Sequence, residues 1–198
     1  TRDTLSATSN TSYGYFGGGY SPGNQRHSSI TRIDFFNETT RLIPTVLSAQ
    51  RHNLSSISSN LYGYFSHGFS PVGVYCSIDR LDFSTETNGL LTPQLPYATE
   101  SSSTVSTSSF GYFAGGNPVT NQICKLNFSN ETASTISAIL SQSKSSSAGS
   151  SSSFYGYFAG GQLPGGVCVI NRLDFSAETI STLTPQLTHP KFGLAAVS

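Results

Sequence analysis

The sequence predicts an all-β fold built from tandem repeats, on three observations. The tripeptide Gly-Tyr-Phe begins at Gly14, Gly63, Gly111 and Gly156, with spacings of 49, 48 and 45 residues. A second motif, Arg/Lys-x-Asp/Asn-Phe-x-x-Glu-Thr, follows each copy within 20 residues and begins at Arg32, Arg80, Lys125 and Arg172. Short aromatic or β-branched runs separated by Gly, Pro and Asn connect the motifs. A repeat of this length is one supersecondary unit that buries its apolar faces by stacking on its neighbours.

Each repeat contains four segments that we predict to be strands of one antiparallel sheet. In the second repeat these segments are 54–59, 61–66, 74–83 and 90–95, and Gly-, Pro- and Asn-containing turns separate them. Short strands at a spacing of about 8–12 residues are typical of all-β folds. No segment shows a convincing helical period. The nearest, 133–140, aligns with the closing strand of the other copies, so we expect little helix.

The repeat boundaries predict four full units and the start of a fifth. We place them at 2–50, 51–98, 99–143, 144–190 and 191–198, the last being the first strand of a fifth repeat. A basic residue opens most units: Arg2, Arg51 and Lys144, with Thr99 in the third. We expect either further blades outside this sequence or copies that join end to end into a fibre, because an open sheet edge invites pairing.

The repeated positions predict how the side chains divide between the two faces of each sheet. Alternation places Leu81 and Phe83 on one face, and Arg80 and Asp82 on the other. We expect these charges to pair along the strand or with the adjacent strand, as scaffold and not as catalytic groups. The Phe-Ser-x-Glu-Thr element is predicted to be a turn in which Ser and Thr hydroxyls bind local amides.

The Gly-Tyr-Phe motif predicts burial on both faces of its strand. Tyr15 and Phe16 must point to opposite faces, and stacking between units would bury both without any ligand. The glycines after the motif suit a tight corner with positive φ. His67 replaces the first of these glycines in the second repeat, so we expect that corner to differ.

Composition excludes several function classes. Charged residues make up 10% of the chain and balance to zero, so no basic field favours nucleic acid or an anionic membrane. No apolar run approaches the ~18 residues of a membrane-spanning segment, and no signal peptide is visible. Serine and threonine supply 57 of 198 residues, which predicts a surface kept wet by hydroxyls or by attached sugars.

Four strands per unit, a diglycine after the second and a later Glu-Thr turn resemble the kelch repeat, whose units are the blades of β-propellers. Five positions carry the resemblance. Arg51 corresponds to the basic residue of the first kelch strand, and Gly115–Gly116 to the diglycine. Phe83 falls at the kelch Tyr, Glu86–Asn88 matches the turn, and Leu90 stands where kelch has its Trp. The chain departs from the pattern because it has no Trp and because Ser-Thr replaces Asp-Pro in the turn. The Gly-Tyr-Phe-Ala-Gly-Gly form is also similar to uncharacterised repeat arrays of cyanobacteria and their phages, which implies surface or virion components.

Neither the cysteines nor the histidines predict a metal or cofactor site. Cys76 and Cys168 share one repeat position and Cys124 lies nearby in another repeat, too far apart for a disulfide if the repeats stack. We expect three small buried thiols. The four histidines occupy unlike repeat positions without metal-binding spacing, and we expect them on the surface or in turns: His27, His52, His67 and His189.

No catalytic motif is present, and five glycosylation sequons are the remaining candidate sites. The chain lacks a Gly-x-Ser-x-Gly elbow, and its glycine runs lack the Lys-Ser/Thr of a phosphate loop. The sequons begin at Asn10, Asn37, Asn53, Asn127 and Asn130. Asn37 and Asn130 share a position in the turn after Phe, where we expect sugar first; the alternative is that Asn simply suits the turn.

These observations predict a non-enzymatic structural or interaction protein without a cofactor, at the cell exterior or on a virion, as the building block of an appendage or fibre. Its expected partners are neighbouring repeats or copies of itself. The alternative is a carbohydrate- or protein-binding propeller module of an adhesin or tail fibre, which would add glycans as partners. An intracellular kelch adaptor is a third reading, disfavoured by the low charge. We expect no nucleic-acid partner and no membrane insertion.

Overall fold

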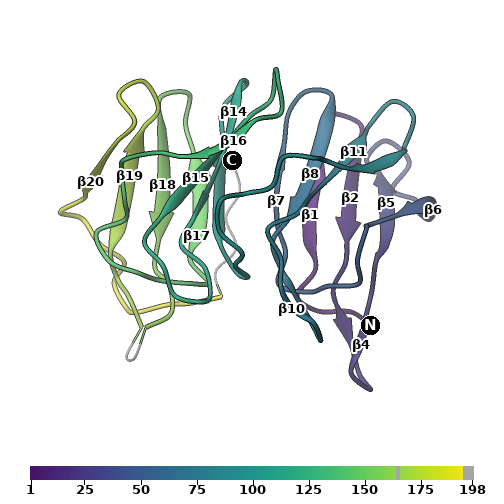
Figure 1. Cartoon of the computed structure of the whole chain (residues 1–198), viewed down its shortest axis with the longest axis horizontal. Coiled ribbons are helices and arrows are strands. Elements are labelled where there is room, and N and C mark those ends of the chain that lie inside the picture. The colour runs from purple at the N-terminus through teal and green to yellow at the C-terminus, as the bar shows by residue number, and fades with distance from the viewer. Residues whose placement is uncertain (164–165, 194–198) are drawn as a thin grey trace. The chain divides into compact units, whose positions relative to one another are not determined.

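The computed structural model describes residues 1–163 and 166–193, and the fold is all-β, with 0% helix and 47% strand. The chain divides into two compact units: the N-terminal unit, Thr1–Ala98, and the C-terminal unit, Thr99–Ser198. The low helix content expected from the sequence is therefore confirmed. Figure 1 labels strands and colours them from purple at the N-terminus to yellow at the C-terminal end.

Each unit contains two four-stranded antiparallel sheets, and each sheet lies within one of the four repeats read from the sequence. The N-terminal unit holds β1 (Ser6–Ser9), β2 (Tyr13–Gly17), β5 (Ser29–Asp34) and β6 (Thr40–Val46) in one sheet, and β7 (Ser55–Ser58), β8 (Tyr62–Ser66), β11 (Ile78–Asp82) and β12 (Asn88–Leu90) in the other. Two short hairpins accompany them: β3 (Tyr20–Ser21) with β4 (Gln25–Arg26), and β9 (Phe69–Ser70) with β10 (Gly73–Val74).

The C-terminal unit repeats this arrangement. Its sheets are β13 (Ser103–Ser106), β14 (Phe110–Ala114), β15 (Ile123–Asn127) and β16 (Ala133–Thr135), then β17 (Ala148–Ser151), β18 (Tyr155–Ala159), β19 (Ile170–Asp174) and β20 (Thr179–Thr182). Within the described residues no sheet closes into a barrel or propeller. The all-β class and the four-stranded sheets are confirmed, while propeller blades remain a prediction.

The predicted first strand of a fifth repeat, 191–198, lies mostly outside the described residues, which end at Gly193 in this part of the chain. Its first residue bonds to the preceding repeat as other repeat openings do. Gly161 N donates to Lys191 O at 2.8 Å, and in the same way Gly116 N donates to Lys144 O at 2.9 Å.

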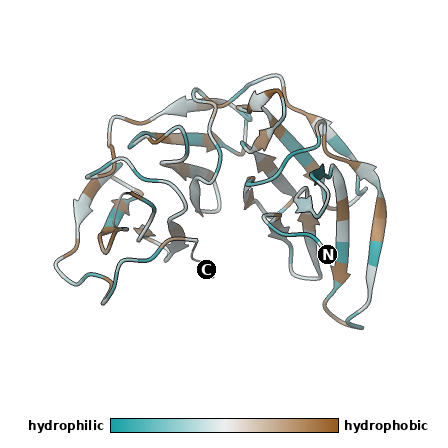
Figure 2. Ribbon diagram, turned by 90° about the horizontal axis from the view of Figure 1, so that it is seen from below, coloured by the Kyte–Doolittle hydropathy of each residue, from teal (hydrophilic) through white to brown (hydrophobic). Residues whose placement is uncertain are grey.

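The two central strands of every sheet pair in the same register. The tyrosine of Gly-Tyr-Phe stands opposite the basic residue of the second motif: Tyr15 with Arg32, Tyr64 with Arg80, Tyr112 with Lys125 and Tyr157 with Arg172. Opposed residues of an antiparallel pair project to the same face. The tyrosine and the basic residue therefore share one face in all four repeats. Figure 2 shows brown apolar residues recurring along the strands with teal polar residues between them.

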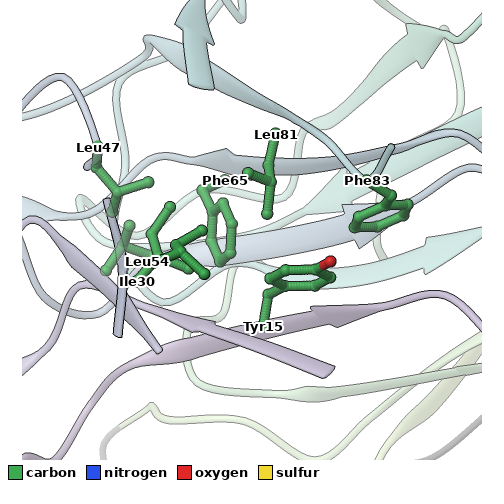
Figure 3. Close-up of a cluster of buried hydrophobic side chains, with 8 residues drawn as sticks. Tyr15, Ile30, Leu47, Leu54, Phe65, Leu81 and Phe83 are labelled. Atoms are coloured by element: carbon green, nitrogen blue, oxygen red, sulfur yellow. The ribbon is translucent and has the colours of Figure 1, made fainter. Parts of the chain in front are cut away.

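The core of each unit lies between its two sheets. In the N-terminal unit, Tyr15 and Ile30 of the first sheet pack with Phe65 and Leu81 of the second, and all four are 0% exposed. Within this unit Tyr15 therefore faces the second repeat, and Phe65 faces the first. This confirms that the tyrosine and phenylalanine positions point to opposite faces; stacking buries Tyr15 and Phe65 fully, whereas Phe16 of the first repeat is only half-buried. Figure 3 shows the side chains of this cluster.

The corner after the Gly-Tyr-Phe strand has the same backbone in all four repeats. Its second residue is always glycine, with φ between 99° and 123°, where an L side chain is strained. Its first residue is glycine in three repeats, but His67 adopts φ 56° there, within the left-handed region that other residues can occupy. The expectation of a different corner at His67 is therefore wrong.

The predicted turn after the third strand is present in every repeat, but a strand-end carboxylate or amide organises it. Asp82 Oδ1 accepts the amides of Ser84 at 2.8 Å and Thr85 at 3.2 Å, and the Ser84 hydroxyl donates to the same oxygen at 2.6 Å. Asp174 makes the equivalent bonds. The Ser84 hydroxyl was predicted to accept a backbone amide, but it donates a hydrogen bond to Asp82, and Asp82 accepts the amides instead.

Candidate functional site: the contact between neighbouring repeats

A pair of stacked aromatic rings joins the two repeats within each unit. The Tyr15 and Phe83 rings lie 5.3 Å apart at an angle of 16°, visible face to face in Figure 3. In the C-terminal unit, Tyr112 and Phe175 lie 5.4 Å apart at 21°. Stacked aromatic pairs add stability beyond their buried area. The same two repeat positions therefore build the same contact twice.

A glutamate in the following repeat binds the tyrosine and the basic residue of the preceding one. Glu86 Oε1 accepts from Arg32 Nη1 at 2.8 Å and from the Tyr15 hydroxyl at 3.5 Å, and Arg41 also pairs with this carboxylate. In the C-terminal unit, Glu178 pairs with Lys125 and accepts from the Tyr112 hydroxyl at 3.3 Å. We call this set the glutamate clamp. Charge-assisted hydrogen bonds of this kind are about twice as strong as neutral ones.

The clamp changes the acidity of the buried tyrosine. Burial, together with the negative charge of Glu86, raises the pKa of Tyr15 to about 12. Burial and Glu178 raise the pKa of Tyr112 in the same way. Both phenols therefore stay protonated at neutral pH and serve as hydrogen-bond donors to the clamp.

The basic residue of the second motif also lies over an aromatic ring of its own sheet in every repeat. Cation-to-centroid distances run from 3.9 to 4.7 Å for Arg32 over Tyr13, Arg80 over Tyr62, Lys125 over Phe110 and Arg172 over Tyr155. Neither predicted pairing, along the strand or with the adjacent strand, describes Arg32, because its partner Glu86 belongs to the neighbouring repeat. The role of these charges as scaffold stays a prediction.

The basic residue that opens the second repeat is fully buried. Arg51 pairs with Asp79, each side chain 0% exposed, and donates to Ser77 Oγ at 2.9 Å. Burial lowers the pKa of Arg51. In the fourth repeat Lys144 is buried at the same position and donates to Phe158 O at 2.9 Å, but Asn171 stands where Asp79 does. Burial without a carboxylate lowers the pKa of Lys144 to about 8.

A shallow groove lies beside the stacked rings in each unit. In the C-terminal unit it encloses about 370 Å³, and its lining includes Phe154, Tyr155, Asp174 and Ser176. Its counterpart in the N-terminal unit, about 380 Å³, is lined by residues at the same repeat positions: Leu61, Tyr62, Asp82 and Ser84. An aromatic wall with a carboxylate and hydroxyls is chemistry that suits a polyhydroxylated ligand.

The histidines are not brought together, and one of them is not on the surface. His189 is exposed and His27 and His52 are half-buried, but His67 is 2% exposed. Burial, and then the nearby positive charge of Arg51, lowers the pKa of His67 to about 3. Of the two predicted settings, surface or turn, only the second describes His67, which lies buried in the corner between β8 and β9.

The cysteines are free thiols, as the repeat spacing predicts. Only Cys124 is buried, while Cys76 and Cys168 are half-buried, so the expected burial holds for one of the three. The Cys76 thiol contacts Gln94 Oε1 at 3.1 Å. Across residues 1–163 and 166–193, no three His, Cys, Asp or Glu side chains gather in a way that could hold a metal ion.

The sequons differ in exposure. Asn37 and Asn130 are exposed, and each side-chain oxygen accepts from the hydroxyl of its sequon threonine, at 2.7 Å and 2.8 Å. The other three, Asn10, Asn53 and Asn127, are half-buried. Accessibility therefore favours the two positions expected to carry sugar first, while their hydrogen bonds equally suit the turn.

Sequence reasoning missed the role of the glutamate. Its recurrence at Glu38, Glu86, Glu131 and Glu178 was a visible signal, but its partner lies 54 residues away in the pair of Arg32 with Glu86. All four glutamates adopt positive φ, from 49° to 56°, at the end of the turn. A local sequence pattern predicts the turn, but it does not predict which residue of another repeat the glutamate side chain binds.

Comparison with known proteins adds no family identity. The chain matches no protein-family model, and no curated protein is a significant relative in sequence. Among the described residues there is also no helix of the length and apolarity needed to cross a membrane. The assignment of function therefore rests on the geometry of the repeats.

Proposed function

We propose that this chain is a non-enzymatic structural protein whose repeats are kelch-like blades, and that it builds an extracellular or virion appendage. The single observation that carries the proposal is the repeated contact between neighbours. The Tyr–Phe stack and the glutamate clamp occur at the same positions in both units. Because the same repeat positions form the contact in both units, the contact supports a scaffold in which each repeat is stabilised by packing on its neighbour.

The use of charge supports a scaffold. The basic residues that carry the contacts, Arg32, Arg51 and Lys125, are engaged with carboxylates of their own unit. A catalytic carboxylate or base would need access to a substrate, whereas Glu86 and Asp79 are committed to these cations. The recurring charged groups therefore stabilise the stacked sheets.

Surface chemistry supports an exterior location. Serine and threonine supply 57 of 198 residues, while lysine occurs only three times. The exposed sequons Asn37 and Asn130 would accept glycans in a eukaryotic secretory pathway. A hydroxyl-rich surface of low charge suits a filament or coat that must stay hydrated without attracting polyions.

Immunogold electron microscopy on the source cells and on any particles they release tests the proposal. An antibody raised against the whole chain should label surface structures or particles, and pre-immune serum should not. Label confined to the cytosol would refute the exterior role and favour an intracellular adaptor.

A carbohydrate-binding module is the second candidate, favoured by the two equivalent grooves with an aromatic wall, a carboxylate and hydroxyls. Phe154 is 72% exposed at the groove of the C-terminal unit, so Phe154→Ala should preserve the fold. Glycan-array binding that this substitution lowers would support the candidate. An array without a hit for the wild-type chain would remove it.

A further inference from the structure

The first repeat exposes the face that later repeats bury against a preceding neighbour. Phe35 is 50% exposed, whereas Phe83 at the same position is 8% exposed beneath Tyr15. Phe16 and Ile33 are half-buried, while their equivalents in the second repeat, Phe65 and Leu81, are 0% exposed. We call Phe16, Ile33, Phe35 and Glu38 the leading face.

The glutamate of the leading face, Glu38, has nearly the same backbone φ angle as Glu86, the glutamate of the clamp. Glu38 has φ 56°, close to the 54° of Glu86, but Glu38 is exposed. Within the described part of the chain no cation pairs with Glu38, whereas Glu86 binds Arg32, Arg41 and the Tyr15 hydroxyl.

The fourth repeat exposes the opposite face. Ile170 is half-buried, although its three equivalents, Ile30, Ile78 and Ile123, are 0% exposed. Tyr157 is also half-buried, whereas the tyrosines at its position in the other repeats are 0% exposed. We call Tyr157, Ile170 and Arg172 the trailing face.

The cation of the trailing face, Arg172, lies over its aromatic ring as Arg32 does but forms no salt bridge within the described residues. Arg172 lies 4.6 Å from the centre of the Tyr155 ring, as Arg32 lies over Tyr13. Among residues 1–163 and 166–193 no carboxylate forms a salt bridge with Arg172. Arg32 in the same setting holds Glu86 at 2.8 Å.

We propose that the trailing face of one copy docks on the leading face of a second copy, so that Tyr157 stacks on Phe35 and Arg172 binds Glu38. Each partner group has its counterpart in the contact inside the N-terminal unit, where Tyr15 stacks on Phe83 and Arg32 binds Glu86. The faces differ from each other, so the association is head-to-tail and extends into a line unless its rotation closes a ring. This inference rests on the proposed structural role and names its partner as the chain itself.

Both faces leave apolar side chains partly exposed among the described residues. Terminal repeats of stacked arrays normally need a polar outer face for solubility. Here Phe35 and Ile33 remain at one end, and Ile170 and Tyr157 at the other. The apolar residues that bury the internal contact are thus available for an external one.

Charge exchange tests the proposal, with association of the whole chain measured by sedimentation velocity over a wide concentration range. The wild-type chain should form concentration-dependent head-to-tail oligomers. Glu38→Arg alone and Arg172→Glu alone should each weaken self-association at least about tenfold, because like charges then meet. An equimolar mixture of the two variants should assemble as the wild type does. In the mixture, Arg172 of the Glu38→Arg variant meets Glu38 of the Arg172→Glu variant at one contact. At the next contact the introduced Glu at 172 meets the introduced Arg at 38. Opposite charges therefore meet at every contact along the line.

Two controls separate docking from damage to the fold. Val72 is 87% exposed in the β9–β10 turn, outside both faces, so Val72→Ser should leave association unchanged. At a dilution where the wild type is monomeric, the circular dichroism and the urea midpoint of Glu38→Arg should match the wild type, because Glu38 is exposed and lacks a partner in the described structure. Arg172→Glu also removes a cation from the Tyr155 ring, so its control is an unchanged circular dichroism spectrum.

The proposal is overturned if the wild-type chain stays monomeric at all concentrations, as it would if the two faces met within one chain. It is equally overturned if the single exchanges do not weaken association, or if the mixture fails to restore it. Immunogold label on surface structures beside a monomeric chain would leave the proposed function standing and remove only this inference.

Discussion

At the scale of single residues, the position that opens a repeat is matched in charge to its partner in the second and third repeats but not in the fourth. Arg51 faces Asp79, and both side chains are 0% exposed. Thr99 and Cys124, at the same two positions in the third repeat, are both uncharged and buried. A buried charge is tolerated when an opposite charge and hydrogen bonds compensate its lost hydration. Lys144 in the fourth repeat has only a carbonyl and so carries an uncompensated cost.

We expect the stability of the chain to rise from pH 8 to pH 10.5 through Lys144. The pKa of Lys144 is about 8 in the folded state against 10.5 ordinarily, so between these values the unfolded chain binds one more proton. Stability therefore increases by up to about 1.4 kcal/mol per pH unit in this window. Asn171→Asp supplies the missing carboxylate and raises the pKa of Lys144, so it should reduce the rise of the unfolding free energy between pH 8 and pH 10.5. Urea midpoints at pH 7, 9 and 10 measure it; an unchanged slope in the variant would contradict the pairing.

His67 should make the fold sensitive to acid. Its pKa is about 3 in the folded state against 6.5 ordinarily, so the unfolded chain binds the extra proton between these values. Stability is thus lost as pH falls from 6.5 towards 3, by up to about 1.4 kcal/mol per unit from this group. The other repeats have glycine here, so His67→Gly preserves the corner and should reduce the loss between pH 7 and pH 4.5. Tyrosine fluorescence during urea unfolding reports it, and equal losses in both chains would refute the assignment.

At the scale of elements, the turn after the third strand depends on hydrogen-bond acceptance more than on charge. The Ser84 hydroxyl, and then the turn amides, lower the pKa of Asp82, which is therefore ionised at neutral pH. Asn127 fills this position in the third repeat and accepts the Ser129 amide at 2.9 Å without a charge. The chain thus contains its own example of the neutral substitute.

We predict that Asp82→Asn changes the free energy of unfolding by less than about 0.5 kcal/mol, while Asp82→Ala costs about 1 kcal/mol because the turn amides lose their acceptor. Urea denaturation at pH 7 compares the two variants. Equal costs for Asn and Ala would show that charge, not acceptance, holds the turn.

The glutamate clamp has a matched control in the first repeat. Glu86→Ala removes the acid from Arg32 and the Tyr15 hydroxyl and should cost about 1–2 kcal/mol. Glu38→Ala makes the same change at nearly the same φ, and should cost less than about 0.5 kcal/mol. Both are measured by urea unfolding at a dilution where the chain is monomeric. A Glu38 variant as unstable as the Glu86 variant would place the effect in the backbone and not in the clamp.

At the scale of the whole molecule, stability resides in pairs of repeats. Tyr15 and Ile30 of the first repeat share one core with Phe65 and Leu81 of the second, and a second core belongs to the C-terminal unit alone. We expect fragments 1–98 and 99–198 each to unfold cooperatively, and fragment 51–98 not to fold, since one sheet cannot bury its faces alone. Amide dispersion in NMR spectra and thermal unfolding measure this. A folded single repeat would contradict the dependence on stacking.

The local features of this protein follow from its amino-acid sequence. Motif recurrence placed the four repeats' strands, and a period of two assigned Tyr15 and Phe16 to opposite faces, because side chains alternate along any strand. The turn at Phe83–Thr87 and the positive φ of Gly68 followed from residue types whose preferences act within a few bonds.

The groups that meet across repeats depend on the three-dimensional stacking of the sheets. Arg32 finds Glu86, 54 residues away, and not the nearby Asp34, because sheet stacking brings the turn of one repeat over the strand of the preceding one. His67 is buried near Arg51, which opens the same repeat, and its place in a corner between strands did not reveal this burial. Partner choice and burial depend on register and stacking between distant segments, whereas strand, turn and face depend on neighbours along the chain.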